Sequence, residues 1–251
     1  MHRLLVDTAS LDDDSPVLPR EAERHLRVLR PKPGEAVELF DGNGSARTYE
    51  WNGALAARGE IRTMPKPDSS LTLFACVTKG SRWDWTIEKA TELGVSRIVP
   101  VISDRTIVRI TKNERAAKRE RWVRIAEDAA RQSDAMWLPE IAEAVDFRES
   151  LALVRETDCF VGALVKPPPP PLAVALQGCL KQKPGSANMS VYVGPEGDFT
   201  PDELSSLLEI ATPTSFGPTI LRAETAAIFA LSVAVAALAS RNCSESEARE
   251  P

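Results

Sequence analysis

Two acidic residues lie among glycines in the segment Gly194-Pro195-Glu196-Gly197-Asp198-Phe199. Glycine lets a ligand approach the backbone closely. The next residues, Thr200-Pro201-Asp202-Glu203, predict a helix start with an N-cap threonine and a capping box. A helix start can bind phosphate, but the carboxylates of Glu196 and Asp198 would repel one. The segment therefore favours a cationic group, such as a sulfonium or an ammonium; the alternative is a bare turn between strand and helix.

A second segment, Phe216-Gly217-Pro218-Thr219-Ile220-Leu221-Arg222-Ala223-Glu224-Thr225, opens onto the apolar stretch 225–239. An arginine at the mouth of a buried helix needs a partner. Arg222 and Glu224 therefore either take part in chemistry or only pair and cap locally. A third segment, Lys166 followed by Pro167–Pro171, is a rigid connector or a binding loop.

Each of these segments follows a predicted strand. Alternation of strands and helices from Leu71 onward predicts an α/β fold with a parallel sheet. In such sheets ligands bind where the strands end, so the three segments are expected to lie together. The expected strands are Leu71–Val77, Arg97–Ile102, Cys159–Val165, Ser190–Val193 and Thr214–Phe216, and the expected helices include Trp83–Leu93 and Lys112–Arg131.

The first part of the chain has the pattern of a small β-rich domain. A strand is expected at His2–Val6, a helix at Pro19–Arg30, and a hairpin around Asp41-Gly42-Asn43-Gly44, since Asp-Gly and Asn-Gly tolerate positive φ. The proline-rich stretch 64–69 is a linker. Two domains are therefore predicted, 1–70 and 71–251, with 241–251 as a frayed polar tail.

Composition limits the partners of the chain. Its 251 residues carry a net charge of −5, yet residues 78–131 hold 13 Lys and Arg against 8 Asp and Glu, so any RNA footprint is local. Two histidines and four scattered cysteines predict no metal site and a reducing, cytoplasmic setting. The start of the chain has no signal-peptide pattern. The stretch 225–239 is shorter than the ~20 residues of a membrane span, and a buried helix is predicted there.

Several segments together are similar to the ribosomal RNA small subunit methyltransferase E family. Gly194-Pro195-Glu196-Gly197 and the segment from Gly217 to Ala226 resemble its two signature segments. Lys79-Gly80 with 84–95 resembles a third, and His25–Arg30 with Pro33-Gly34 and Phe40–Gly42 a fourth. The resemblance covers nearly the whole chain at the expected spacings.

The resemblance implies a PUA-like β-barrel for RNA, followed by a SPOUT domain whose C-terminal chain forms a trefoil knot. It also implies a homodimer and S-adenosylmethionine as cofactor, held largely by backbone groups of the knot loops. Carried over to this sequence, the cofactor-binding residues are Leu164, Gly194, Glu196, Gly197, Gly217, Ile220 and Leu221.

The implied reaction is methylation of uridine N3 in the RNA of the small (30S) ribosomal subunit. N3 must lose its imide proton before it attacks, and a cation near O2 or O4 would stabilise the anion. Arg222 is predicted for that role, with Glu224 orienting it; no side-chain base is evident, and solvent hydroxide is an alternative. Predicted phosphate contacts are Arg3, Arg27, Arg30, Lys79 and Arg82.

The sequence departs from the family pattern at a few positions. Thr219 stands where the family usually has arginine, Ala223 where it has threonine, and no Gly-Arg follows Ser133. Two further hypotheses therefore stay open. One is a non-catalytic RNA-binding or ribosome-assembly protein that kept the fold, and the other is a SPOUT enzyme acting on tRNA.

Overall fold

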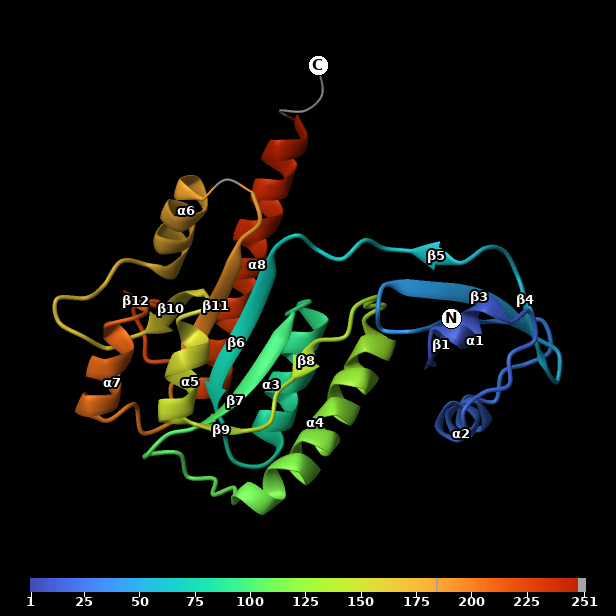
Figure 1. Ribbon diagram of the computed structural model, residues 1–251, viewed down its shortest axis with the longest axis horizontal. Coiled ribbons are helices and arrows are strands. Elements are labelled where there is room, and N and C mark those ends of the chain that lie inside the picture. The colour runs from blue at the N-terminus through green and yellow to red at the C-terminus, as the bar shows by residue number, and fades with distance from the viewer. Residues whose placement is uncertain (184, 248–251) are drawn as a thin grey trace. The chain divides into compact units, whose positions relative to one another are not determined.

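The computed structural model describes residues 1–183 and 185–247, with the side chains of 242–247 left out. The chain divides into two compact units (Figure 1). The first comprises Met1–Pro67 together with Ala126–Leu138, and the second comprises Asp68–Ile125 and the chain from Pro139 onward. Helix α4 (Lys112–Gln132) thus belongs to both units, which a single boundary near residue 70 did not anticipate.

The first unit is built on a five-stranded sheet with the order β1-β2-β3-β4, in which β5 also pairs with β3. β1 pairs parallel with β2, and β2 and β3 form the antiparallel hairpin predicted around Asp41–Gly44. The Asp41 carboxylate accepts hydrogen bonds from the backbone amides of Asn43 and Ser45, which fixes the turn. The elements are β1 (His2–Leu5), α1 (Ala9–Asp12), α2 (Arg20–Leu29), β2 (Glu35–Phe40), β3 (Ser45–Trp51), β4 (Leu55–Ala57) and β5 (Arg62–Thr63).

The core of the first unit includes one face of α2 and side chains of its sheet. Ala22 and Leu26, one turn apart on the helix, are buried in one cluster with Leu4, Val37 and Tyr49. The predicted PUA-like barrel stays a prediction, because the strand pairings give a sheet whose path runs from β1 to β4.

The second unit is built on a seven-stranded sheet with the order β12-β10-β11-β6-β7-β8, in which β9 also pairs with β7. All its pairings are parallel, which confirms the α/β class. The elements are β6 (Ser70–Cys76), α3 (Ser81–Glu92), β7 (Arg97–Ile102), β8 (Glu140–Ile141), β9 (Val145–Asp146), α5 (Phe147–Val154), β10 (Asp158–Gly162), α6 (Leu172–Gln182), β11 (Asn188–Val193), α7 (Pro201–Leu208), β12 (Thr212–Thr214) and α8 (Ala223–Glu247).

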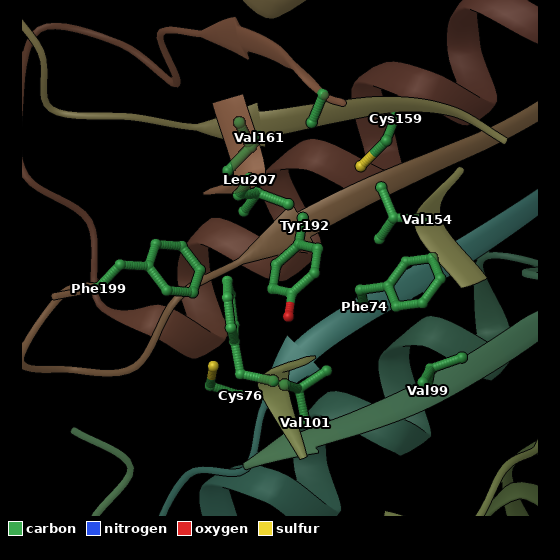
Figure 2. Close-up of a cluster of buried hydrophobic side chains, with 12 residues drawn as sticks. Phe74, Cys76, Val99, Val101, Val154, Cys159, Val161, Tyr192, Phe199 and Leu207 are labelled. Atoms are coloured by element: carbon green, nitrogen blue, oxygen red, sulfur yellow. The ribbon is translucent and has the colours of Figure 1, made fainter. Parts of the chain in front are cut away.

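Both faces of this sheet are covered, which explains the nearly continuous apolar runs of its strands. On one face an aromatic cluster joins the sheet to α5 and α7, with Tyr192 of β11 in its middle (Figure 2). The Tyr192 ring stacks on Phe74 with centroids 5.5 Å apart and meets Phe199 edge-on at 5.6 Å. Its hydroxyl lies 2.8 Å from Ser150 Oγ, so the buried phenol is hydrogen-bonded.

Helix α8 packs against β6, β11, α3 and α6. Ala227, Ala230, Leu231 and Ala234 form its buried stripe. Its stretch Ala223–Arg241 is long and apolar enough to cross a membrane by length and composition, and 33% of an 18-residue part of it is buried. The packing therefore confirms that one side of α8 is buried in the core, whereas the opposite side of the helix is exposed.

Several predicted boundaries were wrong. β10 ends at Gly162 rather than at residue 165, because Ala163 is the last residue whose amide donates to the neighbouring strand, at Thr214 O. β12 covers 212–214 rather than 214–216. Helix α8 continues to Glu247 and takes in most of the predicted frayed tail, of which residues 248–251 lie outside the described residues.

Candidate functional site

A cavity of about 320 Å³ lies at the carboxyl ends of β10, β11 and β12. Its walls are the three chain segments that leave these strands, as expected for a parallel sheet. Its volume is at the lower end of the range of small-molecule sites, ~300–1,000 Å³. The lining residues are Gly162, Ala163, Leu164, Val193, Gly194, Pro195, Glu196, Asp198, Thr214, Ser215, Phe216, Gly217, Thr219, Ile220, Leu221, Arg222, Ala223 and Ala226.

The first wall is the turn from Gly194 to Phe199. A Cβ on Gly194 would stand 3.0 Å from the Phe199 ring, so glycine allows the ring to pack under the turn. The predicted capping box is confirmed, with Glu203 N donating to Thr200 Oγ1 at 3.2 Å and Thr200 N donating to the Glu203 carboxylate at 2.9 Å. The helix that follows therefore holds one end of the turn in place.

Arg105 holds the same turn from outside the segment. Its Nη1 donates to the carbonyl oxygens of Gly197 at 3.0 Å and Phe199 at 3.2 Å. Glu203 also accepts a 2.9 Å hydrogen bond from the Asp104 amide. Sequence reasoning missed these anchors, because they lie in the loop after β7, roughly 90 residues from the turn.

The second wall is the segment that follows β12. The Phe216 ring lies over Gly162, where a Cβ would stand 2.5 Å from its Cε2 atom. Gly217 has a φ of +125°, a conformation that side chains rarely adopt. The proline segment braces this wall, since Ser215 N donates to Pro170 O at 2.9 Å and Leu172 N donates to Ser215 O at 3.0 Å. The proline segment therefore braces this wall, and none of residues 166–171 lines the cavity.

The rim of the cavity is apolar and accessible. Leu164 is 68% exposed and Ile220 82% exposed, although both are large hydrophobic side chains. Exposed apolar side chains at the mouth of a pocket are typical of a ligand-binding surface. Together with the glycine backbone, these side chains suit a flat apolar ring bordered by hydrogen-bonding groups.

A cluster of three charges adjoins the first wall. Arg82 Nη1 lies 3.4 Å from Glu196 Oε1, and Arg82 Nε lies 3.8 Å from Glu224 Oε1. The other oxygen of Glu224, Oε2, is buried and has no hydrogen-bond partner among the described residues. Arg82 thus joins the two segments that carry the signature-like motifs.

Arg222 and Glu224 do not meet as predicted. Arg222 lines the cavity, is exposed, and forms no ion pair within the part of the chain that the structure describes. The Glu224 carboxylate faces Arg82 instead. Side chains two positions apart at a helix start do not share a face, so the predicted orienting of Arg222 by Glu224 is at odds with this geometry.

Six of the seven predicted cofactor-binding residues line this one cavity: Leu164, Gly194, Glu196, Gly217, Ile220 and Leu221. Gly197 lies beside it and is tied to Arg105. Thr219 and Ala223, two of the positions that depart from the family pattern, also line it. Gly162 was not predicted as a site residue, and Phe216 entered only as the start of the second segment, since nothing in the sequence pairs a strand-end glycine with an aromatic ring about 50 positions away.

The predicted RNA contacts have different environments. Arg3 is 4% exposed, and its guanidinium donates to Glu38 at 2.7 Å and to Ala130 O at 2.8 Å. A phosphate cannot reach it, so its assignment as an RNA contact is corrected to a core ion pair. Arg27, Arg30, Lys79 and Arg82 are exposed. Arg27 is also bonded to Glu23 at 2.6 Å, one helical turn away.

Sequence reasoning named Arg27 but missed that it belongs to a row of arginines on α2. Arg20, Arg24 and Arg27 follow each other at spacings of four and three residues and are all exposed, so they share one face of the helix. Within the described residues, no group of three or more His, Cys, Asp or Glu side chains is arranged to hold a metal ion.

Comparison with known proteins gives concordant matches. The family model described as RNA methyltransferase domain matches residues 65–235. A Synechocystis sp. protein named ribosomal RNA small subunit methyltransferase E is 32% identical, over 82% of this chain and 67% of the relative. A Mycobacterium bovis protein of the same name is 31% identical, over 85% and 82%.

Solved structures give the same picture. The ribosomal RNA small subunit methyltransferase E of Neisseria gonorrhoeae, bound to S-adenosyl methionine, has a TM-score of 0.74 at 29% identity, over 92% of this chain and 95% of that one. A Legionella pneumophila protein in complex with the same cofactor has a TM-score of 0.75 at 27% identity, over 94% and 98%.

Proposed function

The chain belongs to the ribosomal RNA small subunit methyltransferase E family, and from this premise we propose that it methylates N3 of a uridine in small-subunit ribosomal RNA, with S-adenosylmethionine as methyl donor. The observation that carries the proposal is the single cavity into which both signature-like segments open, at the carboxyl ends of three parallel strands.

The cavity residues fit this cofactor. Gly217 has open space around its Cβ position and leaves room for close contact with adenine and ribose groups, while Gly194 brings bare backbone to the cavity wall. Leu164 and Ile220 offer an apolar surface for the adenine ring. Glu196 and the nearby Asp198 supply negative charge suited to a sulfonium and an ammonium group. When bound, the cofactor supplies a methyl group carried on a positively charged sulfur.

Arg222 is the residue we assign to the reacting base. It lines the cavity with its guanidinium exposed and unpaired among the described residues, so it is available to a substrate. A guanidinium near O2 or O4 of uridine would stabilise the anion left when the N3 proton passes to solvent. The target base must leave its stack to reach the cavity. We revise the role of Glu224 to partner of Arg82.

The remaining proposals concern partners and location. The exposed arginines of α2, with Arg30, Lys79 and Arg82, provide candidate phosphate contacts on the two units. We propose a homodimer through the uncovered side of α8, where Thr225, Phe229, Ser232 and Ala236 are exposed at helical spacing. The predicted location is the cytoplasm, where ribosomal subunits are found. A trefoil knot in the C-terminal chain stays part of this proposal.

The test is transfer of labelled methyl groups to small ribosomal subunits that lack N3-methyluridine, with the product mapped by mass spectrometry. We expect one labelled uridine N3, lost in Arg222→Ala and retained in Arg148→Ala, which removes an exposed arginine from α5, away from the cavity. Label on another atom would refute the N3 assignment. Loss in both variants would refute the specific role of Arg222.

Thr219 supports a second candidate function. It lines the cavity at a position where the family resemblance implies arginine, so the chain has one cation fewer beside the proposed substrate. A protein that binds RNA and cofactor without transferring the methyl group would fit this change. Cofactor binding without methyl transfer to any ribosomal or transfer RNA would favour that function over the leading one.

A further inference from the structure

Three charges beside the cavity do not balance. Arg82 pairs with Glu196, which lines the cavity, and with Glu224. This cluster of one arginine and two glutamates carries one net negative charge. Arg82 is divided between two carboxylates, at 3.4 Å and 3.8 Å, whereas the tight ion pair of Arg3 and Glu38 measures 2.7 Å. Arg82 therefore neutralises neither glutamate fully.

Glu224 carries the clearest sign of this excess. Its side chain is 13% exposed, and its Oε2 atom is buried without a hydrogen-bond partner among the described residues. A carboxylate withdrawn from water is costly unless a positive charge approaches it. Glu196, with a side chain 24% exposed, lines the cavity and pairs with the same arginine, Arg82. The free energy of the Glu196 and Glu224 carboxylates is thus lower when a cation occupies the cavity than when a neutral group occupies it.

We propose that the Arg82–Glu196–Glu224 cluster makes the cavity discriminate between the charged methyl donor and its uncharged-sulfur product. The inference rests on the proposed function. In methyl transfer the bond from sulfur to the methyl carbon breaks, its electron pair stays on sulfur, and uridine N3 forms the new bond to carbon. The sulfonium becomes a thioether, so the ligand loses one positive charge while the cluster keeps its negative one. Glu196 and Glu224 favour the donor, and Arg82 limits that preference so that the donor is not held too tightly.

The size of the effect follows from Coulomb's law. A unit charge placed about 7 Å from the sulfur, with an effective dielectric constant of about 40, would change the binding constant roughly five- to tenfold. The effect is expected to fall at high salt, because Arg82 is 47% exposed and counter-ions screen it.

The experiment measures the dissociation constants of S-adenosylmethionine and S-adenosylhomocysteine by calorimetry and reports their ratio. Arg82→Gln is expected to raise the preference for the donor about five- to tenfold, and Glu196→Gln and Glu224→Gln to lower it by a similar factor. Arg82→Lys keeps the charge and should keep the ratio. Arg148→Gln and Glu209→Gln remove exposed charges outside the cavity lining and serve as matched controls.

The ratio separates electrostatics from structure. A cluster that only holds the two loops in place would change both dissociation constants equally and leave the ratio unchanged, which would overturn the proposal. Arg82→Lys restores the ratio only if charge is the cause, even where Arg82→Gln weakens both ligands. A wild-type protein that binds neither ligand would instead overturn the proposed function, and the proposal with it.

Discussion

The contact between Gly162 and Phe216 gives the sharpest prediction on cavity geometry. In Gly162→Ala the new Cβ would stand 2.5 Å from Phe216 Cε2 and 2.9 Å from two further ring atoms. Ordinary carbon contacts are ~3.5–4.0 Å, so the ring must move by about 1 Å. Overpacking of this kind costs about 1–3 kcal/mol. Because Gly162 and Phe216 both line the cavity, a displaced ring changes its shape.

We expect Gly162→Ala to weaken S-adenosylmethionine binding by about 5- to 150-fold. This range is the overpacking cost of about 1–3 kcal/mol converted into a ratio of dissociation constants. Calorimetry measures the binding, and urea unfolding measures any part of the cost that appears as lost stability. Gly178→Ala is the matched control, since that glycine lies in α6 with open space around its Cβ position. It is expected to stabilise the protein by ~0.5–1 kcal/mol.

A second substitution tests the cause. Phe216→Leu shortens the side chain and should relieve the clash, so Gly162→Ala with Phe216→Leu is expected to bind better than Gly162→Ala alone. Native affinity and native stability in Gly162→Ala would refute the reasoning, because the ring would then have moved without cost. A double variant that is no better than the single one would show that Phe216 is not the contact that matters.

Three further predictions concern stability. Thr200→Ala removes the N-cap of α7 and should cost about 1 kcal/mol in urea unfolding, whereas Thr200→Ser should retain most of it. Burial raises the pKa of the Cys76 and Cys159 thiols to about 12. Both should resist iodoacetamide at pH 8.5 in the native protein and react in urea. Unfolded thiols ionise near pH 9 and these folded ones near 12. The stability that the two neutral thiols contribute is therefore complete below pH 9 and falls as the pH rises toward 12. A urea midpoint that stays constant from pH 8 to 10 would contradict this. Arg3→Met leaves the buried carboxylate of Glu38 without its closest cation and should lower the free energy of unfolding by about 3 kcal/mol. Thermal unfolding measures this loss, and an unchanged melting temperature would argue against the core ion pair.

The elements that sequence reasoning predicted well carry their own local signal. The β2–β3 hairpin was predicted because Asp-Gly and Asn-Gly dipeptides favour its turn, and Arg97–Ile102 matches β7 at both ends. The start of α7 was predicted because Thr200, Pro201 and Glu203 each satisfy a separate requirement of a helix N-terminus. In these places the physics acts over a few neighbouring residues.

The features that were missed depend on tertiary contacts. Helix α6 follows five prolines, and its start is fixed by the hydrogen bond from Leu172 N to Ser215 O, about 40 residues away. The end of α4 joins the first unit because Ala130 and Met136 pack with Phe40 and Ala46, which no local pattern announces. The periodicity of apolar residues predicts which face of a helix is buried. It does not predict which distant segment of the chain packs against that face.

Arginine shows most clearly where sequence reasoning ends. Arg3 and Arg82 were given the same role, as phosphate contacts, because a sequence shows charge and not burial. Arg3 is 2% exposed at its side chain, lies over the Phe40 ring at 4.1 Å, and is tied to Glu38. It has no freedom to exchange that carboxylate for another anion without leaving a buried charge unpaired. Arg82 is 47% exposed and shared loosely between two glutamates, so exchanging partners costs it little. What separates the core arginine Arg3 from Arg82, which we propose for the site, is therefore how completely its charge is already matched, and that follows from which carboxylates the fold brings to it.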